Sequence, residues 1–419
     1  MTDIFSYHDG DLCVEDVPLS VIAERVGTPV YVYSHSALYN AWHNLAQAFS
    51  AIDPVFTFAV KANTSKAIMA AIASWGGGAD TVSGGEIKRA LNAGIAADKV
   101  VFSGVGKSEA EIEAALKAGI MMFNMESAAE LELINSIAGR LKVKAPVGFR
   151  VNPDVDARTH PKITTGLAGN KFGLSVEKAF EQYKAAAALP NIEIKGISCH
   201  IGSQITEISP FVDAAGRILN LTERLRAQGI ALHYFDMGGG LGITYHHENP
   251  PTWRDYAAAV APIVEQAGMR LVLEPGRSIV GNAGVLLTRV MFSKHSPVKK
   301  FVVVDAAMND LMRPSLYDAY HAIKPLRLNL YAQNEVVDIV GPICETGDFM
   351  AKERELRPMQ NGEYLAIMSA GAYGFSMASN YNSRVHAAEV MVKGKEWEVI
   401  NPRQSLDDLY RNETTPAWI

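Results

Sequence analysis

Phe56-Thr57-Phe58-Ala59-Val60-Lys61-Ala62-Asn63 joins a short β-branched and aromatic run to a single lysine. The run is typical of a buried β-strand, so we expect Lys61 where that strand ends. A lysine that leaves an apolar strand is poorly solvated, which destabilises its ammonium form and makes the neutral amine available to attack an aldehyde. The stretch therefore indicates a lysine that forms a Schiff base or, as the ordinary alternative, a strand that ends in a surface lysine.

Short apolar runs of this kind recur along the first two thirds of the chain. They cover residues 56–60, 79–82, 100–103, 121–124, 147–151, 196–200, 234–237 and 271–274. Most of the segments between them are rich in Ala, Leu, Glu and Lys at helical spacing. Strands that alternate with helices imply right-handed crossovers and a parallel sheet. Eight such units over roughly 250 residues predict an α/β fold, with a (β/α)8 TIM-like barrel at residues 29–280.

Beyond residue 281 the pattern changes. Residues 285–294, 300–305, 335–341, 363–368 and 387–392 have the composition of strands separated by turns, without regular helices between them. We predict a second, mainly β domain of the sandwich or barrel kind, made of residues 1–28 and 281–419, because chain termini often lie close together. A short helix is expected near residues 18–25.

Composition excludes several classes of partner. The 419-residue chain carries a formal net charge of -6 and has a pI near 6.0, which gives no electrostatic reason to expect nucleic acid. Cys13, Cys199 and Cys344 lie far apart, which argues against a metal cluster or a disulfide framework. No basic leader and no membrane-length apolar run is present. We therefore expect a cytoplasmic protein that acts on a small molecule, without metal, membrane or nucleic acid.

Polar side chains accompany several of the predicted strands. Asp80, His200 and Glu274 each end or follow an apolar run, as Lys61 does. Because the carboxyl ends of barrel strands meet at one rim, we expect these groups to converge. Two glycine-rich turns, at residues 238–240 and 276–278, would meet the same rim. Their bare backbone N–H groups can bind a phosphate, whereas a tight turn without a ligand is the alternative for each.

This set of groups suits a phosphorylated aldehyde with an aromatic ring. Glu274 in an apolar strand needs a partner, either a pyridinium N–H or, as the structural alternative, Arg277 in a salt bridge. A neutral His200 could stack on such a ring, or be an ordinary hydrogen-bonded histidine of the barrel. Ser203 could donate to the phosphate.

The Lys61 strand and residues 200–203, 238–240 and 274–277 resemble, in the same order, the fold-type III pyridoxal-phosphate decarboxylases. The resemblance is strongest to the diaminopimelate decarboxylase branch of that family, and it covers essentially the whole chain. Supporting segments are Asn152-Pro153-Asp154-Val155-Asp156-Ala157, Thr159-His160-Pro161-Lys162-Ile163, Thr165-Gly166, Asn170-Lys171-Phe172-Gly173 and Cys344-Glu345-Thr346-Gly347-Asp348. It implies pyridoxal 5′-phosphate as cofactor and a homodimer with shared active sites.

The resemblance also implies roles for individual residues. Lys61, His200 and Cys344 would be catalytic: Lys61 holds the cofactor, His200 stacks on its ring, and Cys344 donates a proton across the dimer interface. Glu274 would pair with the pyridine nitrogen. The further cofactor contacts that it implies are Asp80, Ser203, Gly239, Gly240, Pro275, Gly276, Arg277 and Tyr373. The substrate contacts that it implies are Arg277, Arg313, Tyr317, Glu345 and Tyr373.

The activity that the resemblance implies is decarboxylation of meso-2,6-diaminopimelate at its D-configured centre, giving L-lysine and carbon dioxide in the last step of lysine biosynthesis. The second amino-acid end of this substrate needs a cation for its carboxylate and an anion for its ammonium. Arg277 and Arg313 could bind the carboxylate and Glu345 the ammonium. Arg313 lies in a segment that we expect to be a loop. The Cys344 thiol suits proton donation because an unperturbed thiol, with a pKa near 8.5, is mostly protonated at neutral pH.

Two alternatives stay open. One is a related decarboxylase of carboxynorspermidine, arginine or a D-amino acid. The other is a non-catalytic homologue that binds pyridoxal phosphate, since fold does not determine function. A dehydrogenase is disfavoured, because the glycine run at residues 238–240 does not open the GxGxxG helix that dinucleotide binding requires.

Overall fold

The computed structural model describes residues 4–157, 159–160, 165–166, 170–329 and 331–419. By its internal contacts the chain divides into two compact units. The barrel unit comprises Ala41–Thr244 and Glu248–Ile279, and the β unit comprises Met1–Asn40, Tyr245–His247 and Val280–Ile419. In the described part of the chain, no helix is long and apolar enough to cross a membrane.

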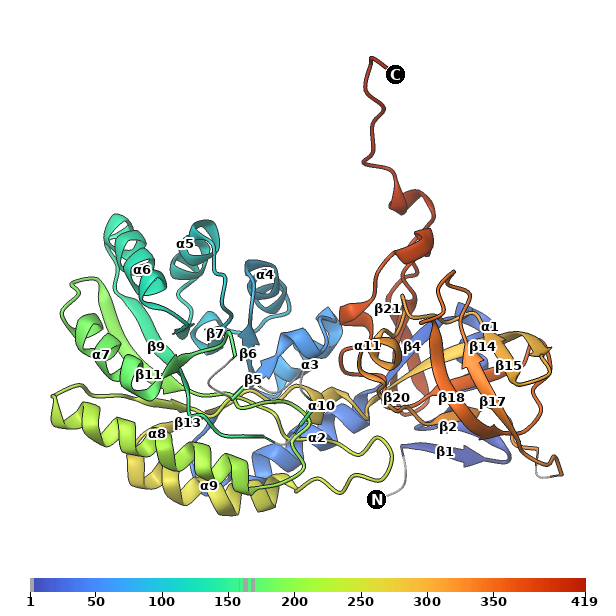
Figure 1. The fold of residues 1–419 in the computed structure, drawn as a ribbon, viewed down its shortest axis with the longest axis horizontal. Helices are drawn as coiled ribbons and strands as arrows, with labels where there is room; N and C mark the ends of the chain where they lie inside the picture. Colours follow the sequence, from blue (N-terminus) through green and yellow to red (C-terminus); the bar gives the residue numbers. More distant parts are fainter. Residues whose placement is uncertain (1–3, 158, 161–164, 167–169, 330) are drawn as a thin grey trace. The chain divides into compact units, whose positions relative to one another are not determined.

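Parallel strands form the closed centre of the barrel unit (Figure 1). Each pairs with its neighbour, and β13 pairs with β5 to complete the ring. These strands are β5 (Val55–Ala59), β6 (Gly78–Thr81), β7 (Val100–Phe102), β8 (Met122–Met125), β9 (Ala145–Asn152), β11 (Ile192–Ser198), β12 (Tyr234–Asp236) and β13 (Arg270–Leu273), with the short β10 (Leu174–Ser175) beside β9. The predicted TIM-like barrel is confirmed, and each of the eight apolar runs overlaps one of its strands.

Helices surround these strands on the outside of the barrel (Figure 1). They are α3 (Lys66–Ser74), α4 (Gly84–Asn92), α5 (Glu109–Ala118), α6 (Ala128–Leu141), α7 (Val176–Ala187), α8 (Ser209–Ala227) and α9 (Trp253–Ala267), while α2 (His35–Ala48) begins in the β unit. Ser83, Ser108, Ser127, Ser175 and Thr252 each cap a helix by accepting a bond from the backbone N–H three residues later. Ser83 and Ser127 closely follow the ends of β6 and β8, so these two strand ends lie in short turns.

The β unit is organised around one long strand, β14 (Gly284–His295). Along its first half β14 pairs with β4 (Val30–Ser34) and β19 (Tyr364–Ile367), and along its second half with β15 (Lys300–Val304). The same sheet includes β16 (Ile323–Pro325), β17 (Glu335–Val340), β18 (Phe349–Leu356), β20 (Ala388–Lys393) and β21 (Glu396–Asn401). A smaller sheet of β1 (Phe5–His8), β2 (Asp11–Val14) and β3 (Val17–Pro18) precedes α1 (Leu19–Val26), the short helix expected near residues 18–25.

The boundary between the units falls later in the chain than residue 28. β4 pairs with β14 in antiparallel and with β20 in parallel, so residues up to Asn40 belong to the β unit. β18 and β21 were not among the expected strands. Their sequences, FMAKEREL and EWEVIN, carry charged residues on the exposed face, which hides the apolar alternation.

Arg313 was expected in a loop, and this expectation is wrong. It is the first residue of a short helix, α11 (Arg313–Tyr317), with Pro314 in its first turn. Proline suits the start of a helix because the N–H that it lacks has no partner there in any case. The helix makes Arg313 a buried residue with 7% exposure.

Candidate active site

A cavity of about 410 Å³ opens at the carboxyl ends of the barrel strands. Its lining includes Lys61, Ser103, Asn124, Arg150, Phe172, Ser198, Cys199, His200, Asp236 and Glu274. This is the rim on which the active sites of such barrels are built. The structure therefore brings together Lys61, His200 and Glu274, which lie on separate parts of the sequence, as the strand pattern predicted.

Lys61 lies in a 3-10 turn, Val60–Ala62, directly after β5. Its Nζ is 2.5 Å from Oδ2 of Asp80, which lies next to the last residue of β6 and is fully buried. The ammonium is therefore balanced by a carboxylate, which differs from the poorly solvated lysine expected from the strand alone. β5 and β6 pair in parallel with Ala59 opposite Asp80, and this register places the two side chains together.

His200 follows β11 and is held as a neutral ring. Its Nδ1 accepts a bond of 3.3 Å from the Gly239 N–H, which leaves the proton on Nε2. Burial lowers the pKa of His200 well below its usual value, and the positive charges of Arg150 and Lys61 lower it further. A neutral, fixed imidazole can lie flat against an aromatic ring without repelling a cation.

Glu274 follows β13 and is buried in the cavity wall. Its Oε1 has no hydrogen-bond partner among the residues that the structure describes. Burial raises the pKa of Glu274 well above its usual value, and the nearby Asp236 and Asp80 raise it further. A buried carboxyl oxygen without a partner is costly. The nitrogen of a pyridine ring is a group that would satisfy it.

Three turns meet beside this carboxyl group. A Cβ added to Gly240 would lie 2.4 Å from the Gly202 carbonyl oxygen, and one on Gly239 would lie 2.2 Å from that of Glu274. Arg277 donates to Ser203 Oγ at 3.0 Å. Only glycine permits these close approaches. We call Ser203 with the turns 238–240 and 276–278 the phosphate cradle, because its bare backbone and hydroxyl suit a phosphate.

Gly276 and Pro275 complete the cradle at the end of β13. A Cβ on Gly276 would come within 3.0 Å of the Cβ atoms of Ala59 and Ala62, so this turn lies directly against the Lys61 turn. The Pro275 carbonyl accepts a bond from the Ala59 N–H. The cavity, the unsatisfied Glu274 oxygen and the cradle together fit a phosphorylated pyridine aldehyde.

Arg150, to which no role was assigned from the sequence, also faces the cavity. It ion-pairs with Glu126 at 3.1 Å, and its guanidinium lies 4.6 Å from the centre of the Phe172 ring. Glu126 also accepts a bond from the Gly173 N–H. The pair thus anchors the chain that leads into β10 beside the cavity. Position at a strand end is the signal that marks Arg150 and Asp236 in the sequence.

The remaining predicted residues belong to the β unit. Arg313 donates to His321 Nε2 at 2.9 Å, and its guanidinium lies 4.4 Å from the centre of the Tyr245 ring. His321 is fully buried, and its Nδ1 donates to the Met368 carbonyl, which leaves Nε2 as the acceptor for Arg313. His321 and Tyr245 were not identified from the sequence, where nothing near them marks their role.

Cys344 and Glu345 are exposed on the loop between β17 and β18. The Cys344 N–H donates to Asn382 Oδ1 at 2.9 Å, and the Tyr381 hydroxyl donates to Glu345 Oε2 at 2.8 Å. Asn382 has a φ of +55°, which asparagine tolerates better than most residues. One turn therefore fixes both residues of the pair.

Tyr317 and Tyr373 also lie in the β unit. Tyr317 ends α11, and Tyr373 has a φ of +56°, a strained backbone for an aromatic residue. Of the segments that carry the family resemblance, Pro161, Lys162 and Ile163 lie outside the described residues.

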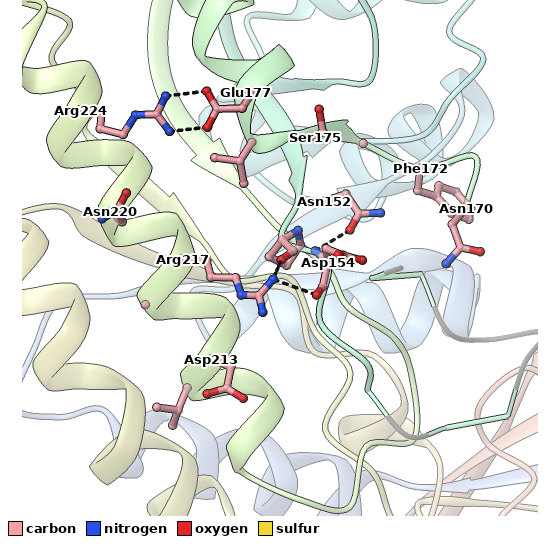
Figure 2. A pocket seen from close by; sticks show the side chains of 15 residues that line it. Asn152, Asp154, Asn170, Phe172, Ser175, Glu177, Asp213, Arg217, Asn220 and Arg224 are labelled. Carbon is pink, nitrogen blue, oxygen red and sulfur yellow. Dashed lines mark hydrogen bonds and ion pairs between the residues drawn. The ribbon is translucent and has the colours of Figure 1, made fainter. Parts of the chain in front are cut away.

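A second, larger cavity of about 950 Å³ lies between α7, α8 and the segment after β9 (Figure 2). Its arginines are engaged by the chain itself. Arg224 binds Glu177 with two bonds of 2.8 and 2.7 Å, and Arg217 donates to the carbonyl oxygens of Pro153 and Asp154. Among the described residues, no lysine or histidine lines this larger cavity. The smaller cavity, which contains Lys61 and His200, is therefore the better catalytic candidate.

Comparisons with known proteins agree with this geometry. Residues 35–281 match the family model described as "Pyridoxal-dependent decarboxylase, pyridoxal binding domain". Diaminopimelate decarboxylase of Neisseria meningitidis serogroup B is 54% identical over 96% of this chain and 97% of its own, and that of Vibrio cholerae is 48% identical over 98% and 99%.

Solved structures agree equally well. Diaminopimelate decarboxylase from M. jannaschii matches with a TM-score of 0.95 at 38% identity, covering 99% of both chains. The Helicobacter pylori enzyme, solved in complex with L-lysine, matches with a TM-score of 0.91 at 40% identity, covering 94% of this chain and 98% of that one. A lysine/ornithine decarboxylase from Vibrio vulnificus, at 21% identity and a TM-score of 0.79, shares the fold.

Proposed function

Because the chain belongs to the diaminopimelate decarboxylases, within the pyridoxal-dependent decarboxylase family, we propose that it decarboxylates meso-2,6-diaminopimelate at the D-configured centre. The products are L-lysine and carbon dioxide, in the last step of lysine biosynthesis. The observation that carries this proposal is the identity of 54% with a curated diaminopimelate decarboxylase over 96% of the chain.

The cofactor is pyridoxal 5′-phosphate, and the barrel cavity fits it. When bound, it supplies an electron-deficient ring that takes up the electrons left behind as carbon dioxide departs. Lys61 would hold its aldehyde carbon, Glu274 Oε1 its ring nitrogen, and His200 one face of its ring. The phosphate cradle would hold its phosphate.

Asp80 and His200 prepare the cavity for this chemistry. Asp80 holds Lys61 Nζ at 2.5 Å, so it orients the amine and stabilises its protonated form. His200, neutral because of its lowered pKa, shields one face of the cavity from water without adding positive charge. The opposite face is left for substrate.

Selection of the substrate rests on groups of opposite charge. Arg277 and Arg313 would bind the carboxylate at the far end of diaminopimelate, and Glu345 would bind its ammonium. Tyr317 and Tyr373 would line the same site. His321 fixes the direction of the Arg313 guanidinium, because it presents an acceptor, Nε2, at 2.9 Å. A simple diamine precursor has no second carboxylate and would not need this arginine.

Cys344 would donate the proton that replaces the departing carboxylate. It is the exposed thiol of the chain, since Cys13 and Cys199 are buried. The proton leaves Sγ for the substrate Cα, and solvent restores it. Exposure of Cys344 supports a site completed by a second copy of the chain.

We further propose a homodimer in which Cys344 of one copy serves the cavity of the other. Mixing Lys61→Ala protein with Cys344→Ala protein should restore part of the activity, because one of the two mixed sites is then intact. No recovery after confirmed exchange of subunits would contradict shared sites.

The central test follows cofactor absorbance and carbon dioxide release in one sample, before and after addition of meso-diaminopimelate. An absorbance band that depends on Lys61, together with carbon dioxide release, is the expected result. A band without carbon dioxide release would favour a decarboxylase of carboxynorspermidine, arginine or a D-amino acid, or a non-catalytic homologue. Parallel assays with those amino acids separate these outcomes. The cytoplasmic location expected from the sequence stays a prediction.

A further inference from the structure

Three carboxyl groups lie buried together at the rim of the barrel, and Lys61 is the one described lysine in the cavity lining beside them. Asp80 and Asp236 have 0% exposure and Glu274 has 8%. Lys61 is bonded to Asp80. Asp236 and Glu274 form no ion pair among the described residues, so their charge must be balanced in another way.

Asp236 and Glu274 come from neighbouring parallel strands. Asp236 ends β12 opposite Val272 of β13, and the Glu274 N–H bonds to the Gly238 carbonyl at 2.8 Å. This register sets the two side chains beside each other, and hydrogen bonding between them lowers the pKa of Asp236 while raising that of Glu274. Two adjacent buried carboxylates cannot both be charged cheaply, so such a pair shares one proton.

The donors around the pair decide which member is charged. Asp236 Oδ1 accepts from the Gly238 N–H at 2.8 Å, and Oδ2 accepts from Asn124 Nδ2 at 2.8 Å. Asn124 is itself bonded to Ser103 Oγ. Glu274 Oε1 has no such donor among the described residues. Donors stabilise the ionised form, so Asp236 keeps the charge and Glu274 the proton.

The titration of each group agrees with this assignment. Burial raises the pKa of Asp236 to about 6, with Gly238 and Asn124 opposing the rise. Burial and the charges of Asp236 and Asp80 raise the pKa of Glu274 well above its usual value, with Lys61 opposing. The other titratable groups nearby are those of Cys199, His200 and Tyr256, together with the permanent charge of Arg150.

We propose that Asp236 is a positioning residue for the proton at the ring nitrogen of the cofactor. Asp236 stays ionised, one proton stays on Glu274 in the cofactor-free protein, and that proton is retained between Glu274 Oε1 and the ring nitrogen when pyridoxal phosphate binds. When the proton is transferred, the O–H bond of Glu274 breaks and an N–H bond to the ring nitrogen forms. No other reactant takes part. The inference depends on the proposed function only in that the cofactor is pyridoxal phosphate; it does not depend on the substrate.

The negative charge of Asp236 has a measurable consequence. It raises the pH at which the proton leaves the Glu274–ring nitrogen pair, because losing that proton would leave two anions side by side. Without Asp236 the cofactor would lose its ring proton at lower pH and would become a weaker electron acceptor. The charge thus extends activity to higher pH.

The test is a pH titration of the holoenzyme followed by cofactor absorbance, comparing the parent protein with Asp236→Asn. The asparagine keeps the shape of the side chain, and an amide flip of Asn124 can satisfy it. We expect the alkaline midpoint to fall by about one pH unit or more. Asp53→Asn is the matched control, because Asp53 is an exposed carboxylate of the same unit, paired with Arg270 at 2.9 Å. An unchanged midpoint in Asp236→Asn would overturn the proposal.

A second measurement does not depend on the stability of that variant. Infrared spectra of the full cofactor-free chain should be compared at pH 8 between Asp310→Asn protein and the same protein with Glu274→Gln added, because burial raises the pKa of Asp310 to about 7 and its carboxyl group would otherwise contribute. The difference should contain the carbonyl band of a protonated carboxyl group, and a difference without this band contradicts a proton stored on Glu274. Neither measurement uses diaminopimelate, so failure of the proposed substrate would leave both results standing.

Discussion

In the barrel unit the predicted residues are buried or half-buried near strand ends, whereas in the β unit Cys344 and Glu345 are exposed on a loop. Lys61 is fixed by an ion pair to a neighbouring strand end. Cys344 and Glu345 are fixed by hydrogen bonds to a turn that contains Tyr381 and Asn382. The comparison teaches that the groups proposed to bind the cofactor lie on rigid elements, whereas two of the groups proposed to act on the substrate, Cys344 and Glu345, lie on a loop that can vary.

Arg313 lies between these two extremes. It is buried as Asp80 and Glu274 are, but its position depends on a histidine and an aromatic ring rather than on strand register. The candidate substrate site therefore has one rigid end, at Arg313, and one exposed end, at Glu345. Substitutions that weaken each end should have effects of different size.

The largest effect is expected at the barrel site. Lys61→Ala should lower kcat by roughly 10⁴-fold or more, because it removes the group that holds the cofactor covalently. The cofactor absorbance band should vanish with it. Lys66→Ala is the matched control, since Lys66 is an exposed lysine at the start of α3. Retention of both band and activity in Lys61→Ala would place the reactive amine elsewhere.

An intermediate effect is expected at the rigid end of the substrate site. Arg313→Ala should lower kcat/KM for diaminopimelate by about 10²-fold, because it removes a buried partner of a carboxylate. Cofactor absorbance should not change. His321→Leu should lower kcat/KM about 10-fold, since leucine offers the guanidinium no acceptor. Full activity of Arg313→Ala toward another amino acid, with little toward diaminopimelate in either protein, would support the alternative decarboxylases.

Asp310 is a buried carboxyl group of the β unit that we expect to affect stability but not cofactor binding. Burial raises the pKa of Asp310 to about 7, although its side chain accepts a bond from the Ala307 N–H. Between pH 4 and 7 the unfolded chain releases this proton and the native chain keeps it, so Asp310 makes the protein less stable as pH rises through that window.

We expect Asp310→Asn to change the free energy of unfolding differently at the two ends of this window. The variant should gain about 1 to 3 kcal/mol more over the parent protein at pH 8 than at pH 4. Denaturant unfolding at the two pH values measures this difference. The cofactor titration should not change. A shift of the pH midpoint of cofactor absorbance in this variant would show that Asp310 also acts on the cofactor, as Asp236 is proposed to do.

The smallest effect is expected at the exposed end. Tyr381→Phe removes one hydroxyl that donates to Glu345, so KM for diaminopimelate should rise about 3- to 10-fold while kcat changes little. Tyr410→Phe is a control, because that exposed hydroxyl bonds to Asp407 in the C-terminal segment. A loss in kcat as large as that of Arg313→Ala would show that the loop is not the adjustable part of the site.

Much of the barrel follows from local patterns. The alternation of apolar runs with helical segments predicts parallel strands, and parallel strands in a closed barrel bring their carboxyl ends to one rim. Lys61, His200 and Glu274 could therefore be placed together from their positions after such runs. The strands β18 and β21 escaped this reasoning, because their charged exposed faces obscure the alternation.

The sequence by itself determined the fold class and the position of Lys61, His200 and Glu274 after apolar strands, since the periods of strands and helices are local properties. The tertiary structure alone decided their partners. Lys61 meets Asp80 and Asp236 meets Glu274 through the register between strands, and Arg313 meets His321 through a helix and a strand end. Register and contacts between distant segments depend on how the whole chain packs. Register and distant contacts cannot be read from a local sequence pattern, and they determine which groups in the site are charged.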